Sequence, residues 1–346
     1  MKLSELGEFG LIERLRQLVP TAGPGVIVGI GDDTAVLETT GGTQLLATCD
    51  MLVEGEHFLV DRLTPFQLGW KALAVNVSDI AAMAGLPRFA LISLGIPPHL
   101  EAEYLDDLYR GLAALAQAHG VILVGGDTVR SRRGLVVDIT VLGEVPKGGA
   151  VLRSGARVGD LVLVTGQLGD SAGGLEFLLQ GPAGGRGFLP QEVGLIKAHL
   201  EPRPRVREAQ AAVRAGRVTA MDDISDGLAS EIREITGSSG VGARLWVERI
   251  PISPALQTAA RAWGKPALDF ALFGGEDYEL VLTVPPTEAE AVAEAIQKET
   301  GTRASLIGEI LPAHEGLQLE SADGSRVGLT RSGWDHFLGD RSNQGT

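Results

Sequence analysis

Aspartates recur directly after glycines or other small residues at the ends of short apolar runs. Gly29-Ile30-Gly31-Asp32-Asp33 places two carboxylates side by side, and related patterns occur at Thr48-Cys49-Asp50, Gly125-Gly126-Asp127 and Asp222-Asp223-Ile224-Ser225-Asp226. Adjacent carboxylates repel each other unless a cation lies between or beside them, and oxygen ligands suit Mg2+ or Ca2+ better than Zn2+. We therefore expect these four segments to form one divalent-metal site gathered from across the chain.

A further candidate ligand, Asp79, lies within a predicted helix. Thr64 can cap this helix, Pro65 fits its first position and Gln67 completes a capping box. Asp79 lies on or beside the apolar stripe of the helix, where a carboxylate is costly unless it is paired or bound to a metal. The sequence thus predicts a metal ligand in the middle of a helix.

The elements that must position these residues alternate between strand and helix patterns. Strands are expected at residues 26–30, 45–48, 91–96, 121–124, 135–142, 161–164, 278–284 and 304–310. Helices are expected at residues 8–18, 64–85, 98–119, 170–179 and 286–300, and another is expected to open at 222–227 and to run to 235. The pattern favours an α/β class with mixed sheets. Each acidic segment is expected in a loop that follows its strand.

The glycine-rich turn at residues 146–149 predicts a domain boundary. We expect an N-terminal domain, residues 1–147. We expect a C-terminal domain, residues 148–346.

Composition excludes several classes of partner. The formal net charge of -14 over 346 residues argues against nucleic acid and anionic membranes, because both require basic surface. The single cysteine, Cys49, excludes an internal disulfide framework and fits a reducing compartment. The apolar runs are too short to span a bilayer, and the first ten residues lack the apolar region of a signal peptide. We expect a cytoplasmic protein.

A glycine cradle for phosphate is missing from the sequence. It contains no Walker loop, and the segment from Gly29 to Thr34 fails the dinucleotide fingerprint at its last glycine. Phosphoryl transfer depends mainly on positioning and charge neutralisation, and divalent ions held by aspartates supply both. If the protein handles nucleotides, it is expected to do so through metal ions.

As an ordered set, these motifs resemble the thiamine-monophosphate kinase family of the aminoimidazole ribonucleotide synthetase superfamily. The resemblance rests on residues 29–33, 48–58, 76–83, 125–128, 153–155, 223–228, 274–280 and 333–337. It implies a two-domain aminoimidazole ribonucleotide synthetase-like fold with an active site in the cleft between domains. The N-terminal domain would bind metal and ATP and form a homodimer, and the C-terminal domain would complete the cleft. It also implies direct in-line transfer of phosphate from ATP to thiamine monophosphate, the last step in making thiamine diphosphate.

The resemblance implies several Mg2+ ions with a set of ligands drawn from the acidic segments. These ligands are Asp33, Thr48, Cys49, Asp50, Asp79, Asp127, Asp223 and Asp226. Cys49 stands where the family commonly has a small hydroxyl residue. Because sulfur is a poor ligand for Mg2+, any role of Cys49 would run through its backbone carbonyl.

The resemblance also implies contacts to the two substrates. The ATP contacts would be Tyr109, Gly126, Asp127, Arg153 and Ser225. The thiamine monophosphate contacts would be His57, Glu276 and Trp334. A cationic thiazolium ring suits an aromatic face such as that of Trp334 and a carboxylate such as that of Glu276.

Structural interpretations of the same residues stay open. An aspartate after a glycine is usually a turn residue, and Ser225 can simply cap a helix. Arg153 can pair with a carboxylate, His57 can be a surface loop residue and Trp334 can be a packing anchor.

Other functions also stay open. Selenophosphate synthetase uses a reactive cysteine or selenocysteine in an N-terminal glycine-rich segment, and a hydrogenase maturation protein of the superfamily uses a C-terminal cysteine. The only cysteine here lies inside a metal motif, which disfavours both. A noncatalytic module would bind Mg-ATP without releasing ADP in response to any thiamine compound.

Overall fold

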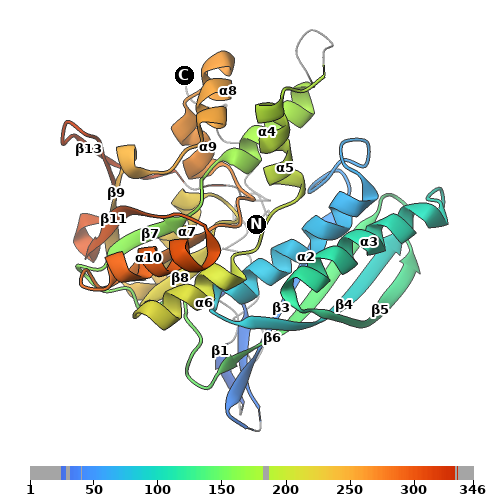
Figure 1. The fold of residues 1–346 in the computed structure, drawn as a ribbon, viewed down its shortest axis with the longest axis horizontal. Coiled ribbons are helices and arrows are strands. Elements are labelled where there is room, and N and C mark those ends of the chain that lie inside the picture. Colours follow the sequence, from blue (N-terminus) through green and yellow to red (C-terminus); the bar gives the residue numbers. More distant parts are fainter. Residues whose placement is uncertain (1–24, 29–31, 40, 182–186, 332, 334–346) are drawn as a thin grey trace, which may run out of the picture.

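The computed structural model describes residues 25–28, 32–39, 41–181, 187–331 and 333. The expected helix at 8–18, the glycines of the first acidic segment and Trp334 lie outside the described residues. Two mixed sheets with helices on their faces make up the described chain (Figure 1). The expected two-domain α/β architecture is confirmed. The boundary at residue 147 stays a prediction.

The first sheet has the strand order β1-β2-β3-β6-β4-β5. Its strands are β1 (Val26–Val28), β2 (Ala35–Glu38), β3 (Thr43–Val53), β4 (Leu86–Ile96), β5 (Ile122–Arg130) and β6 (Val136–Pro146). All neighbours are antiparallel except β4 and β5, which are parallel. Alternate side chains of β6, including Val137, Ile139 and Val141, are fully buried against two helices, α2 (Pro65–Ala82) and α3 (Ala102–His119).

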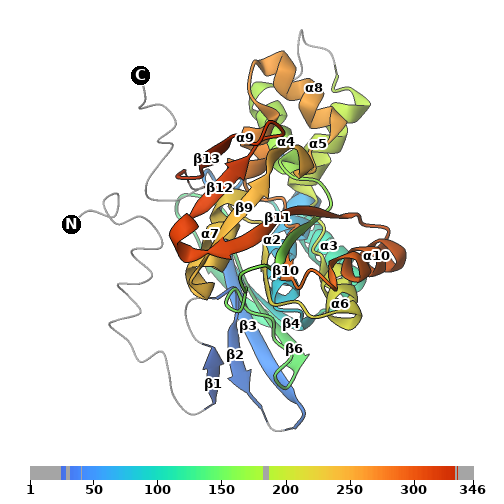
Figure 2. The same ribbon diagram turned by 90° about the vertical axis from the view of Figure 1, so that its left-hand side faces the viewer.

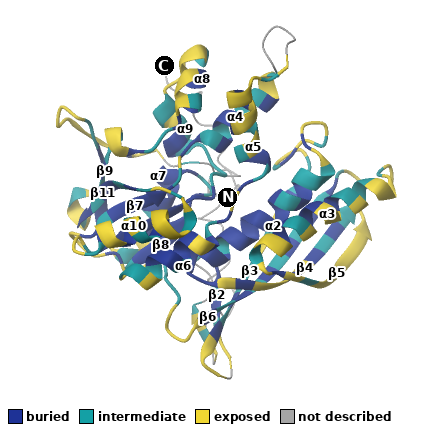
Figure 3. Ribbon diagram, viewed as in Figure 1, coloured by how far each residue is buried: buried dark blue, intermediate teal, exposed yellow. Residues whose placement is uncertain are grey.

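Helix α2 begins where its capping signals predict. The Thr64 hydroxyl accepts a hydrogen bond from the Gln67 N–H at 3.2 Å, and the Gln67 side chain accepts one from the Thr64 N–H at 3.0 Å. Glycines bring α2 close to α3, because a Cβ at Gly69 would lie 2.0 Å from the Leu108 carbonyl oxygen. Figure 3 shows α2 buried along most of its length, since it packs on the first sheet and also contacts β8 and α6 of the second half.

The second sheet has the strand order β13-β12-β9-β11-β7-β10-β8. Its strands are β7 (Leu161–Thr165), β8 (Ala220–Asp223), β9 (Val241–Trp246), β10 (Leu280–Val284), β11 (Ala304–Pro312), β12 (Leu317–Glu320) and β13 (Arg326–Gly328). The helices of this half are α4 (Asp170–Gln180), α5 (Pro190–Leu200), α6 (Val206–Ala215), α7 (Leu228–Ser239), α8 (Pro254–Trp263), α9 (Ala267–Phe273) and α10 (Ala289–Thr300).

Both faces of the second sheet are covered. Figure 2 shows α7 on one side of the sheet and α6 and α10 on the other. Val164 and Val281 therefore belong to one apolar core, while Leu163 and Leu282 belong to another. Burial on both faces explains why β7 and β10 read as continuous apolar runs rather than as alternating ones.

The first sheet differs, because its second face carries no described helix. Met51, Phe89 and Leu91 project from this face and are 52%, 40% and 39% exposed. The edge strand β5 is exposed along most of its length (Figure 3). We call this surface the open face.

The expectation that every acid follows the end of its strand is wrong for two segments. β3 continues past Asp50 to Val53, and β5 continues past Asp127 to Arg130. Strand pairing is the reason, because β6 pairs with β3 along its whole length and β4 pairs with β5 beyond Asp127. Helix α7 likewise begins at Leu228, after the acidic segment rather than inside it.

Candidate active site

Three carboxylates from three elements converge where α2 meets the second sheet. Asp33 precedes β2, Asp79 lies on α2 and Asp223 ends β8. One oxygen of each lies within 4.8 Å of one oxygen of each of the others. Three carboxylates this close repel one another, and the charge of a divalent cation would offset that repulsion.

The surroundings of these carboxylates fit a cation. Burial raises the pKa of Asp79 well above its ordinary value and that of Asp223 to about 8, and the Asp33 carboxylate adds to both shifts. Burial likewise raises the pKa of Asp50 to about 6. The Asp33 Oδ2 atom is buried without a hydrogen-bond partner. The positive charge near Asp50, Asp79 and Asp223 is therefore too small to offset the cost of burying their carboxylates as anions.

Neighbouring polar groups orient the cluster. The Thr48 hydroxyl donates a hydrogen bond to Asp79 Oδ2 at 2.5 Å, and the Ser78 hydroxyl donates one to Asp223 Oδ2. The Asp50 N–H donates to Asn76 Oδ1 at 3.0 Å. Thr48, Asp50 and Asp79 therefore lie together as predicted, although their ligand roles stay predictions.

Arg153 lies against the acidic cluster. Its guanidinium forms an ion pair with Asp33 and lies 3.0 Å, Nε to Oδ2, from Asp222. Burial alone would lower the pKa of Arg153, but Asp222 and Asp33 raise it above its ordinary value. The Arg153 N–H donates to Asp32, which also accepts from the Asp33 N–H. In the described structure the partners of the Arg153 guanidinium are thus carboxylates, and the contact of Arg153 to ATP stays a prediction.

A pocket of about 550 Å3 opens beside the cluster, between the two halves of the chain. Asp50, Asp79 and Asp226 lie at its walls together with Ser225, and two of the predicted substrate residues, His57 and Glu276, also line it. The remaining lining is largely apolar: Leu52, Phe58, Leu59, Leu63, Leu175, Leu178, Leu179, Leu200 and Phe273. An elongated ligand with an apolar ring and a charged end fits this distribution.

Several polar residues in the pocket were not predicted, and two of them meet at Glu276. Lys71 on α2 forms an ion pair with Glu276 at 2.8 Å, and His199 on α5 lies 3.1 Å from the same carboxylate. A signal for Lys71 existed, because Lys71, Val75 and Asp79 follow at four-residue spacing and so share one helix face. Nothing local to the sequence marks His199.

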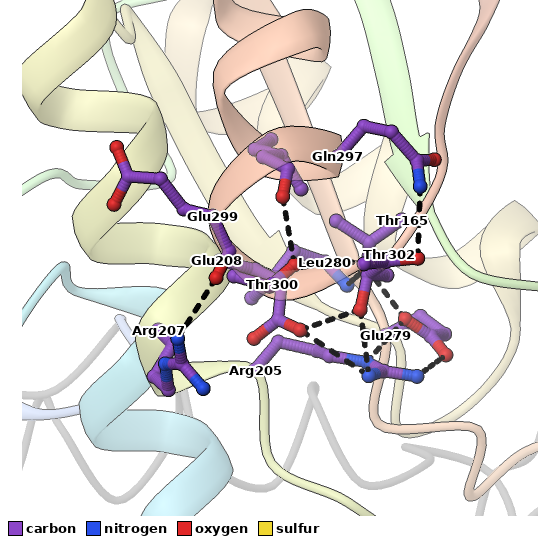
Figure 4. A network of polar contacts seen from close by, with 12 residues as sticks. Thr165, Arg205, Arg207, Glu208, Glu279, Leu280, Gln297, Glu299, Thr300 and Thr302 are labelled. Atoms are coloured by element: carbon purple, nitrogen blue, oxygen red, sulfur yellow. Dashed lines mark hydrogen bonds and ion pairs between the residues drawn. The ribbon is translucent and has the colours of Figure 1, made fainter.

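The segment that carries Glu276 has a strained backbone. Glu276 and Tyr278 have φ of 66° and 50°, values uncommon for residues other than glycine. Their neighbours hold the segment in place. Asp277 Oδ2 accepts a hydrogen bond from the Gly169 N–H at 2.6 Å before α4. Glu279 pairs with Arg205 and accepts from the Thr165 hydroxyl at 2.6 Å (Figure 4).

Other predicted residues lie apart from the cluster. Asp127 and Gly126 lie on β5, the third strand along from β3, which corresponds to about 14 Å at the usual strand spacing. Asp127 is exposed and accepts a hydrogen bond from the Thr128 N–H at 2.8 Å. Tyr109 lies 41% exposed on α3. The contacts of these residues to metal or ATP stay predictions.

Cys49 lies on the opposite face of β3 from Thr48 and Asp50. Its thiol donates to Asp138 Oδ1 at 3.2 Å, on the open face. The side chain therefore points away from the acidic cluster, and only the predicted role of its backbone carbonyl stays open.

Comparisons with known proteins bear on this site. Family models for the AIR synthase related protein match the chain at residues 31–145 (N-terminal domain) and 157–320 (C-terminal domain). The thiamine-monophosphate kinase of Aquifex aeolicus is 39% identical over 285 residues, which cover 82% of this chain and 88% of that protein. The thiamine-monophosphate kinase of Escherichia coli K12 is 39% identical over 331 residues, 96% of this chain and 98% of that protein. The chain belongs to the thiamine-monophosphate kinase family.

Solved structures agree with this membership. AaThiL complexed with AMPPCP and TMP is 36% identical, covers 97% of this chain and 99% of its own, and superposes with a TM-score of 0.82. The hydrogenase maturation protein HypE in complex with ATP has a TM-score of 0.70 at 20% identity over 88% of this chain and 89% of its own, which shows a shared fold alone. Among the described residues of this family member, no helix is both long and apolar enough to cross a membrane.

Proposed function

We propose that this protein transfers a phosphoryl group from ATP to thiamine monophosphate and releases thiamine diphosphate and ADP. The observation that carries the proposal is the pocket between the two halves of the chain, which joins His57 and Glu276 to the acidic cluster. Membership of the thiamine-monophosphate kinase family supports it, as does the similarity to AaThiL complexed with AMPPCP, an analogue of ATP, and TMP.

Mg2+ fits the acidic cluster because every available ligand is an oxygen. Asp33, Asp79 and Asp223 would hold one ion, and the ligands of further ions would come from Thr48, Asp50, Asp226, Asp127 and the Cys49 carbonyl. When bound, several Mg2+ ions would neutralise charge on the phosphates of both substrates.

The residues of the chain would then act chiefly by positioning. The accepting phosphate oxygen is ionised at neutral pH, so direct in-line transfer needs no general base. Glu276 would face the cationic ring of thiamine monophosphate. His57 Nδ1 accepts a hydrogen bond from the Val53 N–H at 3.0 Å, so its neutral ring carries the proton on Nε2 and can donate toward the substrate. The apolar walls of the pocket would exclude water, and Trp334 would complete the substrate side.

We also propose that two chains pair through the open face. Exposed apolar side chains on β3 and β4 support a homodimer, and they belong to the proposed N-terminal domain, residues 1–147. The proposed ATP contacts Tyr109 and Gly126 belong to α3 and β5 of the same half of the chain, whereas Arg153 lies against the acidic cluster and Ser225 lines the pocket. A cytoplasmic location stays a prediction.

Product analysis tests the proposed activity. Purified protein is incubated with Mg-ATP and either thiamine monophosphate or unphosphorylated thiamine, and the products are separated by chromatography. We expect thiamine diphosphate and ADP with the monophosphate only. Folded protein that binds Mg-ATP but forms neither product would contradict the proposal and would indicate a binding module.

A further inference from the structure

Lys71 is the most deeply buried charged side chain of the pocket. It lies in the middle of α2 with 1% of its side chain exposed. Its Nζ atom lies 2.8 Å from each of the two Glu276 carboxylate oxygens and 3.5 Å from His199 Nε2. A buried ammonium group is costly unless it is paired, so the position of Lys71 depends on Glu276.

Glu276 faces the pocket while it pairs with Lys71. A quarter of its side chain stays exposed, and His199 Nδ1 lies 3.1 Å from its Oε2 atom. Burial would raise the pKa of Glu276, but Lys71, followed by His199 and His57, holds it below its ordinary value. Burial and Lys71 lower the pKa of His199 to about 4, so His199 is neutral at pH 7 and Lys71 is the main counter-charge.

The pair joins the two halves of the chain across the pocket. Lys71 belongs to α2, which packs on the first sheet, and Glu276 belongs to the strained segment before β10. Asp79 lies two turns further along the same face of α2, about 12 Å along the helix axis. One rigid helix therefore fixes the distance between the Glu276 carboxylate and the acidic cluster.

We propose, on the basis of the proposed function, that Lys71 is a positioning and specificity-determining residue that holds the Glu276 carboxylate charged and in place against the cationic ring of thiamine monophosphate. Lys71 itself does not contact the reacting phosphates. The groups that face Glu276 are Lys71 from α2, His199 from α5 and His57 from the segment after β3. Arg62 and the acids Asp50, Asp79 and Asp226 line the same pocket.

Steady-state kinetics of Lys71→Met test the proposal. We expect the KM for thiamine monophosphate to rise about 10- to 100-fold, the range for loss of a contact to a charged group. The KM for ATP should stay within about twofold, because the variant leaves the acidic cluster intact. Lys147→Met is the matched control, since Lys147 forms an exposed ion pair with Glu38 at 2.7 Å outside the pocket. An equal rise in both KM values would overturn the proposal.

A double-mutant cycle shows whether Lys71 acts through Glu276. Glu276→Gln should lose as much affinity for thiamine monophosphate as Lys71→Met. The double variant should lose no more affinity than the single variant that binds thiamine monophosphate more weakly. Losses that multiply in the double variant would show that Lys71 acts independently of Glu276.

The pH dependence of binding gives a readout that needs no turnover. Thiamine monophosphate is titrated calorimetrically into each protein with Mg2+ at several pH values. Binding should weaken as falling pH protonates Glu276, and in Lys71→Met this loss should begin at higher pH. Glu276→Gln should lack this loss of binding at low pH, and the comparison distinguishes protonation of Glu276 from protonation of the substrate phosphate. Loss of binding at the same pH in Lys71→Met as in wild type would contradict the proposal.

Failure of the proposed function would be visible separately. If the wild-type protein bound no thiamine monophosphate, the proposed substrate would be wrong. The pKa of Glu276 is then measured by 13C NMR of labelled glutamate carboxyls, with the signal assigned by its absence in Glu276→Gln. A pKa that is the same in wild type and folded Lys71→Met would overturn the role of Lys71 by itself.

Discussion

The Ser78 hydroxyl on α2 donates a hydrogen bond to the carboxylate of Asp223 at the end of β8. These residues are 145 positions apart, and both are almost fully buried. The bond ties the helix of the first sheet to the second sheet at the acidic cluster, and the next residue on the helix is Asp79. The relative position of the two halves of the chain therefore sets the geometry of the proposed metal site.

Replacing Ser78 by Ala should weaken Mg2+ binding. Asp223 would lose a donor that orients it, and loss of such a supporting bond typically costs about 10-fold or more in metal affinity. The Mg2+ concentration for half-maximal activity should rise accordingly. Ser305→Ala is the control, because Ser305 is also buried but lies on β11 away from the cluster. Equal Mg2+ dependence in the two variants would contradict a supporting role for Ser78.

Asp223 should make stability depend on pH when metal is absent. Its folded-state pKa of about 8 lies above the ordinary value of 3.8, so its contribution to stability is present below pH 3.8 and is lost as pH rises through 8. In EDTA at pH 8, Asp223→Asn should be more stable than wild type by a few kcal/mol, and the difference should shrink as pH falls. Thermal unfolding at pH 5 to 8 measures this.

Added Mg2+ should make the wild-type protein more stable than Asp223→Asn at pH 8. The wild-type protein gains stability from a ligand that binds only its folded state, whereas the variant gains less. A variant that is less stable than wild type in EDTA at pH 8 would show that the Asp223 carboxylate is stabilised without a cation.

Gly126→Ala should destabilise the fold as well as remove any contact to ATP. An added Cβ would lie 1.7 Å from the Ile92 carbonyl oxygen, and the φ of 155° is unfavourable for alanine. We expect a loss of more than about 3 kcal/mol in urea unfolding. Gly125 has a similar φ of 157°, but a Cβ there would meet only a side chain at 3.6 Å. The difference in stability between Gly126→Ala and Gly125→Ala therefore measures the cost of the clash. Equal stability of the two variants would contradict this close packing of β4 and β5.

Leu91→Lys should separate the proposed homodimer. Leu91 lies on the open face, where a buried ammonium group without a partner would be costly. Sedimentation velocity should show dimers for wild type and monomers for the variant. Leu189→Lys is matched in exposure, 40% against 39%, but lies before α5, and it should stay dimeric. A monomeric wild-type protein, or dimers in both variants, would rule out this interface.

Local signals were sufficient to predict some of these features. The capping box of α2 depends on residues three positions apart, and the carboxylate of Asp79 on its apolar side indicated a polar partner within the fold. Asp33 and Asp223 were predicted from short patterns, and they do lie beside Asp79. His57 and Glu276 were predicted to contact the same ligand because of the family resemblance, and periodicity did not indicate this.

Other features depend on contacts that no local pattern encodes. Strands β3 and β5 extend beyond their predicted ends because β6 and β4 supply partners for their backbone groups. Lys71, His199 and Glu276 come from elements separated by more than seventy residues of chain, so only the folded arrangement brings them together. Positive φ at Glu276 and Tyr278 likewise has no signal in residue type.

The most direct test of the central claim is the stoichiometry of products formed by wild type and by Asp79→Asn, with saturating Mg-ATP and thiamine monophosphate. Wild type should form thiamine diphosphate and ADP in equal amounts. Asp79→Asn should stay folded and lose about 100-fold or more in kcat, the size of a lost charge-stabilising group. An Asp79→Asn protein with wild-type kcat, or ADP release by wild type without thiamine diphosphate, would contradict phosphoryl transfer at this site.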